Sequence, residues 1–118
     1  MKYHSELPDK IISSLLCSAF YGGSSYWCGM ESYTTNEHGE LDCDGLLDPD
    51  KKLRWTITVP EEQPDRVYAL DIVEIARGVQ TMADKYPVHM AHAMTQRHDS
   101  DTGDVFLQCC LFGKILYG

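Results

Sequence analysis

The segment LRWTITV, residues 53–59, alternates apolar and polar side chains and is the clearest strand pattern in the chain. Successive side chains of a β-strand point to opposite faces, so one face of this strand would carry Leu53, Trp55, Ile57 and Val59. Such a pattern is typical of a sheet with one covered face and one face open to water. Pro60 ends the strand, residues 61–65 (EEQPD) predict a turn, and RVYAL, residues 66–70, predicts a returning strand.

Other segments show the spacing of helices. Apolar residues recur three and four apart in residues 8–21 and again in residues 72–86, where Asp71 precedes the pattern as a cap. Residues 88–98 predict a short helix, with a strand as the alternative. The closing DVFLQCCLFGKILYG is apolar on nearly all sides and predicts a buried helix, which Asp101 and Thr102 would cap. Together with a strand in residues 24–35, the order predicts an α+β fold, in which a small antiparallel sheet of about three strands packs against three to four helices.

The glycine pair in AFYGGSSYWCGM, residues 19–30, follows a helix and precedes a strand. A phosphate-binding loop needs the reverse order and a lysine, and a nucleophile elbow needs G-x-S-x-G. Gly22 and Gly23 therefore predict a helix stop, in which one of them adopts a positive φ.

Composition limits the class of protein. With 118 residues, 43% of them hydrophobic and 24% charged, the chain suits one soluble domain spanning residues 1–118. No apolar run is long enough to span a bilayer, and the first ten residues lack the apolar core of a signal peptide. The five cysteines form no regular framework, which favours reduced thiols in the cytoplasm.

Charge is unevenly distributed along the chain, whose net charge is −8. No Lys or Arg lies between Lys10 and Lys51, while this interval holds Glu31, Glu37, Glu40, Asp42, Asp44, Asp48 and Asp50. Such a segment repels nucleic acids and anionic membranes and attracts basic surfaces, so these carboxylates are candidate partner-binding residues. The alternative is an acidic loop, residues 35–50, that is merely solvated.

Aromatic residues are the second group of binding candidates. Tyr26, Trp27, Tyr33 and Trp55 gather on the expected sheet, where large aromatic side chains most often build the core. The alternative is an exposed binding hot spot, for which Trp27 and Trp55 are the candidates.

Metal and catalytic signals are weak. His89 and His92 would share one face of a helix, but no further ligand has a zinc-site spacing, and His98 lies too far along. LDCDGLLD and DSDTGD do not follow the spacing of calcium loops. No pairing of a nucleophile with a general base, such as Ser/His/Asp or Cys/His, can be recognised from the sequence. The sequence therefore predicts no metal, no cofactor and no catalytic residue.

Three segments carry a family resemblance. GGSSYW, with ARGVQTMADKYP and the closing TGDVFLQCCLFGKILYG, resembles a group of small phage- and prophage-encoded proteins that share G-G-x-x-Y-W and a D-V-x-L-Q-x-x-x-F-G-x-x-x-Y-G tail. Residues 31–65 do not match that group. The resemblance implies a viral setting, in which small acidic proteins are often inhibitors of host defence, anti-CRISPR proteins among them.

The leading hypothesis is thus an acidic inhibitor in the host cytoplasm that binds a host protein with a basic surface, such as the nucleic-acid-binding surface of a CRISPR complex. One alternative is a small metal-dependent or catalytic accessory protein that uses His89, His92 or the acidic loop. Another is a phage interaction module that forms homodimers through its aromatic sheet.

Overall fold

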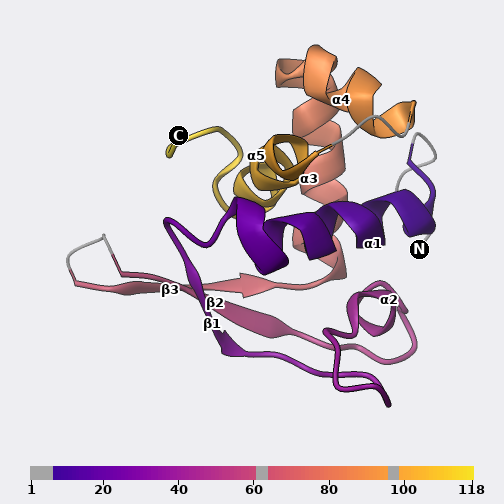
Figure 1. Cartoon of the computed structure of the whole chain (residues 1–118), viewed down its shortest axis with the longest axis vertical. Coiled ribbons are helices and arrows are strands. Elements are labelled where there is room, and N and C mark those ends of the chain that lie inside the picture. Colours follow the sequence, from indigo (N-terminus) through magenta and orange to yellow (C-terminus); the bar gives the residue numbers. More distant parts are fainter. Residues whose placement is uncertain (1–6, 61–63, 96–98) are drawn as a thin grey trace.

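A three-stranded sheet carries helices on one of its faces in the computed structural model, which describes residues 7–60, 64–95 and 99–118 (Figure 1). The strands are β1 (Gly29–Ser32), β2 (Trp55–Val59) and β3 (Arg66–Leu70). The helices are α1 (Asp9–Ser18), a π-helical turn (Ala19–Gly23), α2 (Cys43–Leu46), α3 (Ile72–Lys85), α4 (Pro87–Met94) and α5 (Ser100–Phe112). Helices α1, α3 and α5 lie on the same side of the sheet, while α4 lies farther away from it (Figure 1). The predicted α+β fold is confirmed, although α2 was not predicted.

The sheet has the order β1-β2-β3, and both pairs of strands are antiparallel. In the central strand Trp55, Ile57 and Val59 are buried, whereas Thr56 and Thr58 are only half-buried. The alternation predicted for this strand is therefore confirmed, except that Leu53 precedes its first residue. The returning strand at residues 66–70 is confirmed as well. The turn predicted for residues 61–65 lies largely outside the described residues.

Side-chain caps set where the long helices begin. Asp71 accepts hydrogen bonds from the backbone N–H groups of Val73 (2.9 Å) and Glu74 (3.3 Å) and so caps α3, as predicted. At α5 the cap is Asp99, whose Oδ1 accepts from Thr102 N (3.2 Å), rather than the predicted Asp101 and Thr102. The first turn of α5 thus starts earlier than predicted.

Helix α5 is buried along most of its length, as its apolar sequence predicted, but it ends at Phe112, where Gly113 adopts a left-handed conformation (φ 73°). The helix predicted for residues 113–118 is therefore wrong. It packs between α1 and α3 above the sheet (Figure 1). The end of the helix predicted over residues 88–98, including His98, lies outside the described residues. Among the described residues no helix is both long and apolar enough to cross a membrane.

The first helix ends near the glycine pair, as predicted, but for a different reason. Neither Gly22 nor Gly23 has a positive φ, so the predicted left-handed conformation is wrong. A Cβ at Gly23 would lie less than 3.0 Å from the carbonyl oxygen of Ser100. Gly23 is therefore needed because the start of α5 approaches the backbone closely at this point.

The strand predicted over residues 24–35 is also shorter than expected. Residues 24–27 form turns, and the strand occupies only Gly29–Ser32. Ser24, Tyr26 and Trp27 turn their polar groups towards α5 instead of joining the sheet.

A matched pair of substitutions tests whether the close approach of α5 requires glycine at position 23 but not at position 22. Gly23→Ala should lower the free energy of unfolding by about 1–3 kcal/mol, because its methyl group would displace the start of α5. Gly22→Ala meets no atom within 4 Å and should leave stability unchanged or raise it by up to about 1 kcal/mol. Urea denaturation of both variants measures the difference, and equal losses would contradict the close-approach explanation.

Candidate functional site

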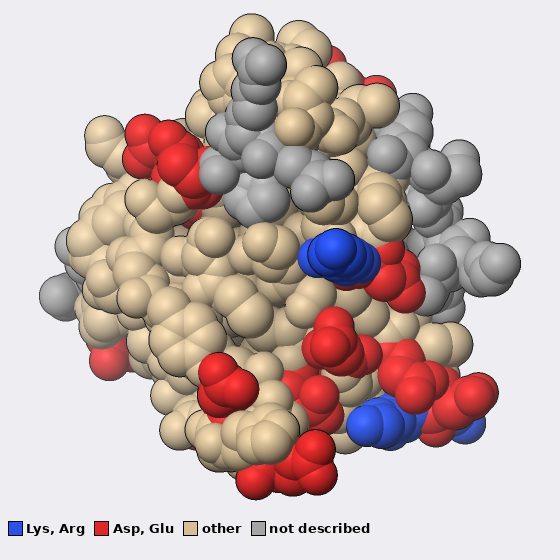
Figure 2. All heavy atoms as spheres, turned by 45° about the vertical axis from the view of Figure 1, so that its right-hand side comes forward, with Lys and Arg blue, Asp and Glu red and all other residues tan. Residues whose placement is uncertain are grey.

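The carboxylates of the acidic segment lie mostly at the surface. Figure 2 shows red acidic side chains gathered at the lower right of this face, with few blue basic ones among them. We call the seven residues predicted from the sequence the acidic surface. Its exposed members are Glu31, Glu37, Glu40, Asp44 and Asp50, while Asp42 and Asp48 are half-buried.

Buried anchors hold this segment against the body of the protein. Cys43, Leu46 and Leu47 are at most 2% exposed, so the middle of the segment belongs to the core. The Tyr21 hydroxyl accepts a hydrogen bond from Leu41 N (3.0 Å) and fixes the segment to the end of the first helix. The interpretation of residues 35–50 as a solvated loop is therefore wrong for the buried residues Cys43, Gly45, Leu46 and Leu47, although Asp44 among them is exposed.

Two of the seven carboxylates have structural roles. Asp42 accepts from Gly45 N (3.0 Å) as the cap of α2 and lies 3.8 Å from Lys51 Nζ. Asp48 accepts from Asp50 N (2.9 Å) and closes a turn. The carboxylates of Glu40 and Asp44 have no such bond among the described residues, and Glu37 has only an exposed contact of 3.5 Å with His38. The five exposed members are therefore the ones that can meet a partner, and Glu37, Glu40 and Asp44 are the three of them that lie closest together in the sequence.

The two tryptophans predicted as partner-binding residues are buried. Trp27 is 1% and Trp55 0% exposed, so their assignment to an exposed hot spot is wrong and their assignment to the core is confirmed. Trp55 donates to Thr34 Oγ1 (3.0 Å), and Phe20 packs on it with ring centroids 5.8 Å apart. Helices cover the face of the sheet that bears Trp55, which leaves it no access to a partner.

The histidine pair lies on α4, and its ring centroids are 6.3 Å apart. The distance from His89 Nδ1 to Thr102 Oγ1 is 3.5 Å. In the described part of the chain, no group of three or more His, Cys, Asp or Glu side chains is arranged to hold a metal ion. The catalytic alternative therefore has no candidate metal site among those residues.

A buried carboxylate that the sequence analysis missed organises the opposite side of the molecule. Asp104 on α5 is 7% exposed. Its Oδ1 accepts from Trp27 Nε1 (2.7 Å), Ser24 Oγ (2.8 Å) and Gln108 Nε2 (3.2 Å), and its Oδ2 accepts from the Tyr26 hydroxyl (2.6 Å). Asp104 thus ties the turn after the first helix to α5.

Gln108 extends this network to the end of the chain. Its Oε1 accepts from Leu116 N (2.8 Å) and Tyr117 N (2.9 Å), while its Nε2 donates to Tyr117 O (3.0 Å). The Tyr117 ring in turn stacks on Trp27 at a centroid distance of 5.3 Å. The G-G-x-x-Y-W element and the closing tail, which carry the family resemblance, therefore meet around two side chains of α5.

One sequence signal could have revealed this network. Asp104 and Gln108 are spaced four residues apart in an otherwise apolar segment, which places two polar side chains on the same face of a buried helix. Buried polar groups require partners, so such a pair predicts hydrogen bonds to other segments.

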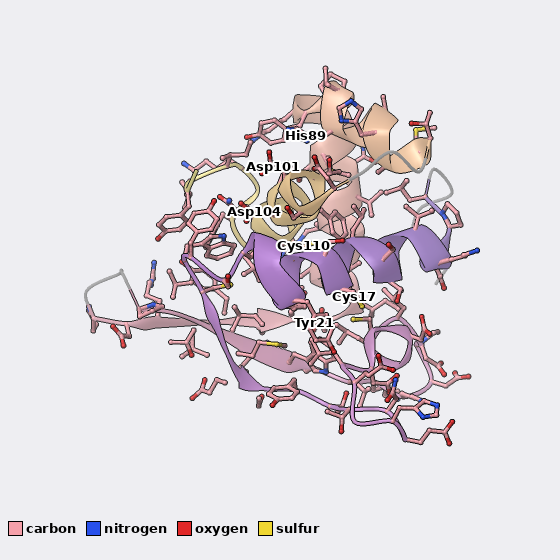
Figure 3. The ribbon with its side chains drawn as sticks, in the orientation of Figure 1. Cys17, Tyr21, His89, Asp101, Asp104 and Cys110 are labelled. Carbon is pink, nitrogen blue, oxygen red and sulfur yellow. The ribbon has the colours of Figure 1, made fainter. Side chains whose placement is uncertain are left out.

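An open cavity of about 440 Å³ lies beside Asp104. Tyr26, His89, Asp101, Asp104 and Tyr117 line it together with apolar residues of α5 and the tail. Figure 3 shows His89, Asp101 and Asp104 near one another where α4 and α5 meet. This cavity brings two carboxylates next to aromatic side chains.

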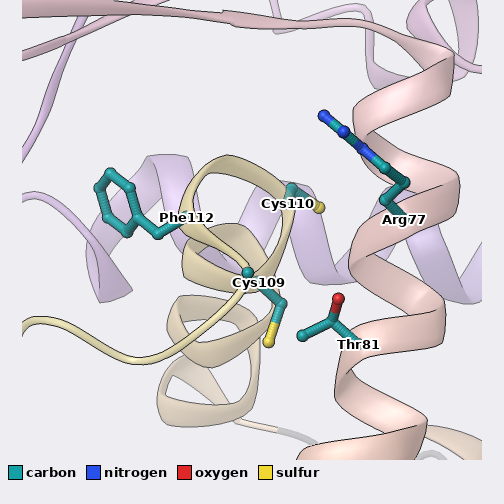
Figure 4. Close-up of a pocket in the computed structure, with 6 residues that line it drawn as sticks. Arg77, Thr81, Cys109, Cys110 and Phe112 are labelled. Carbon is teal, nitrogen blue, oxygen red and sulfur yellow. The ribbon is translucent and has the colours of Figure 1, made fainter.

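A smaller cavity of about 210 Å³ lies between α3 and α5, where Arg77, Thr81, Cys109 and Cys110 line it (Figure 4). Burial raises the pKa of Cys109 to about 12, and it raises the pKa of Cys110 well above the usual thiol value. Both thiols therefore stay protonated at neutral pH and are poor nucleophiles. This cavity offers no sign of thiol catalysis.

The remaining close pair of thiols joins α1 to the acidic segment. Cys17 Sγ and Cys43 Sγ lie 3.3 Å apart as free thiols. Burial raises the pKa of Cys43, and the hydrogen bond to Cys17 adds to this effect. Their contact helps to hold α2 under α1.

Comparisons with protein families, curated proteins and solved structures found no match for this chain. The resemblance to small phage and prophage proteins therefore stays a prediction that rests on the residues quoted for it.

Removing the Asp104 carboxylate should destabilise the protein strongly. Asp104→Ala leaves the buried Trp27 N–H and Ser24 hydroxyl without their acceptor, and we expect a loss of about 3 kcal/mol or more in the free energy of unfolding. Asp101→Ala, on an exposed neighbour in the same helix, is the control and should cost less than about 1 kcal/mol. Urea denaturation compares them, and a similar small loss in both would contradict a structural role for Asp104.

Tyr26 should report on the same network at alkaline pH. Although Tyr26 is 52% exposed, its partial burial raises the pKa of its hydroxyl to about 12, and the hydrogen bond to Asp104 and the negative charge of Asp104 add to this rise. Because the folded-state pKa exceeds the unfolded value of about 10, this stabilisation is fully present below pH 10 and is lost as pH rises through 12.

The measurement is the free energy of unfolding of the parent and of Tyr26→Phe over this pH range. We expect the difference between the two proteins to shrink as the pH rises. If the difference in the free energy of unfolding stays constant up to about pH 12, the fold does not hold the Tyr26 hydroxyl in its neutral form.

Proposed function

We propose that this chain is a protein-binding module whose acidic surface docks on a basic surface of a partner protein. The observation that carries the proposal is the clustering of exposed carboxylates, Glu37, Glu40 and Asp44 above all, in an interval without Lys or Arg. A one-sign surface steers a partner of opposite charge and discriminates against partners of the same charge.

The anchoring of the segment supports this proposal. Buried Leu46 and Leu47, the Asp42 cap and the Tyr21 hydrogen bond restrict the backbone that bears the free carboxylates. Binding then costs less conformational entropy than it would for an unstructured acidic tail. An arrangement of this kind favours a specific contact over a general electrostatic attraction.

The partner that fits this chemistry is a protein whose basic surface otherwise holds nucleic-acid phosphates. Such surfaces bind phosphates through Lys and Arg side chains, and carboxylates on a restrained backbone can occupy the same positions. An inhibitor of a nucleic-acid-binding host protein, as the phage resemblance implies, is the form of this function that we propose.

The other two hypotheses receive less support from the geometry. Trp27 and Trp55 are buried, so the aromatic sheet proposed for homodimers keeps only Tyr26 and Tyr33 as exposed members of its original set. The catalytic alternative has no metal centre among the described residues.

A pair of double variants tests the acidic surface. Glu37→Lys with Glu40→Lys reverses two charges that are free of structural bonds, whereas Asp65→Lys with Asp84→Lys makes the same change in net charge outside the segment. All four positions are exposed, so each substitution should change stability by less than about 0.5 kcal/mol. Asp42 is left intact because it caps α2.

The parent chain is first used to capture host proteins from a nuclease-treated lysate, and the binding of the captured protein to each variant is then measured at low and high salt. We expect the Glu37/Glu40 variant to associate at least about tenfold more slowly at low salt, and the Asp65/Asp84 variant to remain within about twofold of the parent. Displacement of nucleic acid from the partner by the parent would support inhibition. Equal weakening by both double variants would show that net charge, and not this surface, governs binding.

A further inference from the structure

The cavity beside Asp104 is assembled from four separate parts of the chain. Tyr26 comes from the turn after the first helix, His89 from α4, Asp101 and Asp104 from α5, and Tyr117 from the tail. The described residues that line it include no Lys, no Arg and no member of the acidic surface. It is therefore a site separate from the surface assigned to partner binding above.

The floor of this cavity carries a buried negative charge. All four side chains that donate hydrogen bonds to Asp104 are neutral, namely Ser24, Tyr26, Trp27 and Gln108. The ion pairs found between described side chains at Glu37, Asp42 and Glu74 do not include Asp104. Three of the hydrogen bonds satisfy Oδ1, but no Lys or Arg among the described residues pairs with the carboxylate.

One oxygen of Asp104 retains room for another donor. A carboxylate oxygen accepts about two hydrogen bonds. From the described residues Oδ1 accepts three, whereas Oδ2 accepts one, from Tyr26. Asp101 lies one helical turn earlier on α5, is exposed and lines the same cavity. Its charge also contributes to the raised pKa of Tyr26, so the field around the tyrosine hydroxyl is negative. These features favour a positively charged occupant.

We propose that this cavity binds a guanidinium group, with Asp104 Oδ2 and the Asp101 carboxylate as its acceptors. A planar guanidinium presents several N–H donors in a fork that suits two carboxylate acceptors, and it stacks on aromatic rings such as that of Tyr26. The volume of about 440 Å³ lies within the range of small-molecule sites. The group comes either from a free small molecule or from an arginine side chain of a partner, and both share this chemistry.

Isothermal titration calorimetry of the full chain with two guanidinium probes tests the proposal. Propylguanidinium represents a free small molecule, and N-acetyl-arginine amide represents a side chain on a peptide backbone. N-acetyl-norleucine amide has a similar length without the charge and is the ligand control. Asp101→Asn removes one acceptor at an exposed position, and Asp65→Asn makes the same change in net charge at a residue that lines none of the cavities described above.

We expect saturable binding of propylguanidinium that weakens at least about fivefold in Asp101→Asn and less than about twofold in Asp65→Asn. Binding of N-acetyl-arginine amide as well supports an arginine side chain as the source, whereas binding of propylguanidinium alone supports a free small molecule. The thermal midpoints of both variants confirm that they are folded.

Three outcomes would overturn the proposal. One is the absence of saturable heat with either guanidinium probe at about 10 mM. Another is equal weakening in Asp101→Asn and Asp65→Asn, which would indicate attraction to the net charge alone. The third is equal binding of the norleucine control. None of these results bears on the acidic surface, because no variant in this experiment alters it.

Discussion

The buried carboxylate of Asp104 is the interaction on which the rest of this structure depends. It accepts hydrogen bonds from Ser24, Tyr26 and Trp27, which fixes the turn that leads from the first helix into β1. Through Gln108 the same network reaches the tail. A hydrogen bond between buried groups is strong because water does not compete for it. For the same reason, a buried polar group without a partner lowers the stability of the fold considerably. The position of α5 therefore determines how both the sheet and the tail attach to the core.

Sequence patterns correctly predicted the helices and strands that depend on interactions between residues close together in the sequence. The alternation around Trp55 and Ile57 and the spacing of apolar residues after Asp71 depend on neighbours within a few positions, and both elements were predicted correctly. The Asp104 network could not be read in this way, because its partners Ser24 and Trp27 lie 80 and 77 residues away along the chain. Gly23 is a similar case, since its role depends on where α5 starts and not on its own turn.

The charge of the candidate binding surface could be predicted from the sequence, but the role of each of its residues could not. Composition alone located the interval without Lys or Arg. It could not show that Asp42 and Asp48 bind backbone N–H groups, because that depends on the turns that those residues adopt. Nor could it decide between core and surface for Trp55, since the choice depends on which face of the sheet the helices cover. The assignment of the tryptophans to an exposed site is wrong for this reason, while the acidic part of the site stays a prediction.

Carboxylates in this protein have three separate physical roles, and net charge does not distinguish them. Asp71 and Asp99 cap helices, where a hydrogen bond from Thr102 N lowers the pKa of Asp99 and the positive end of the helix dipole favours its charge. Asp104 holds the core together. The third group, represented by Glu37 and Glu40, is exposed and available to a partner protein. The exposed carboxylates of this third group lie in one interval without Lys or Arg, so the negative field that a partner meets is concentrated there. Placement of charge, more than its total, therefore sets what this chain can bind.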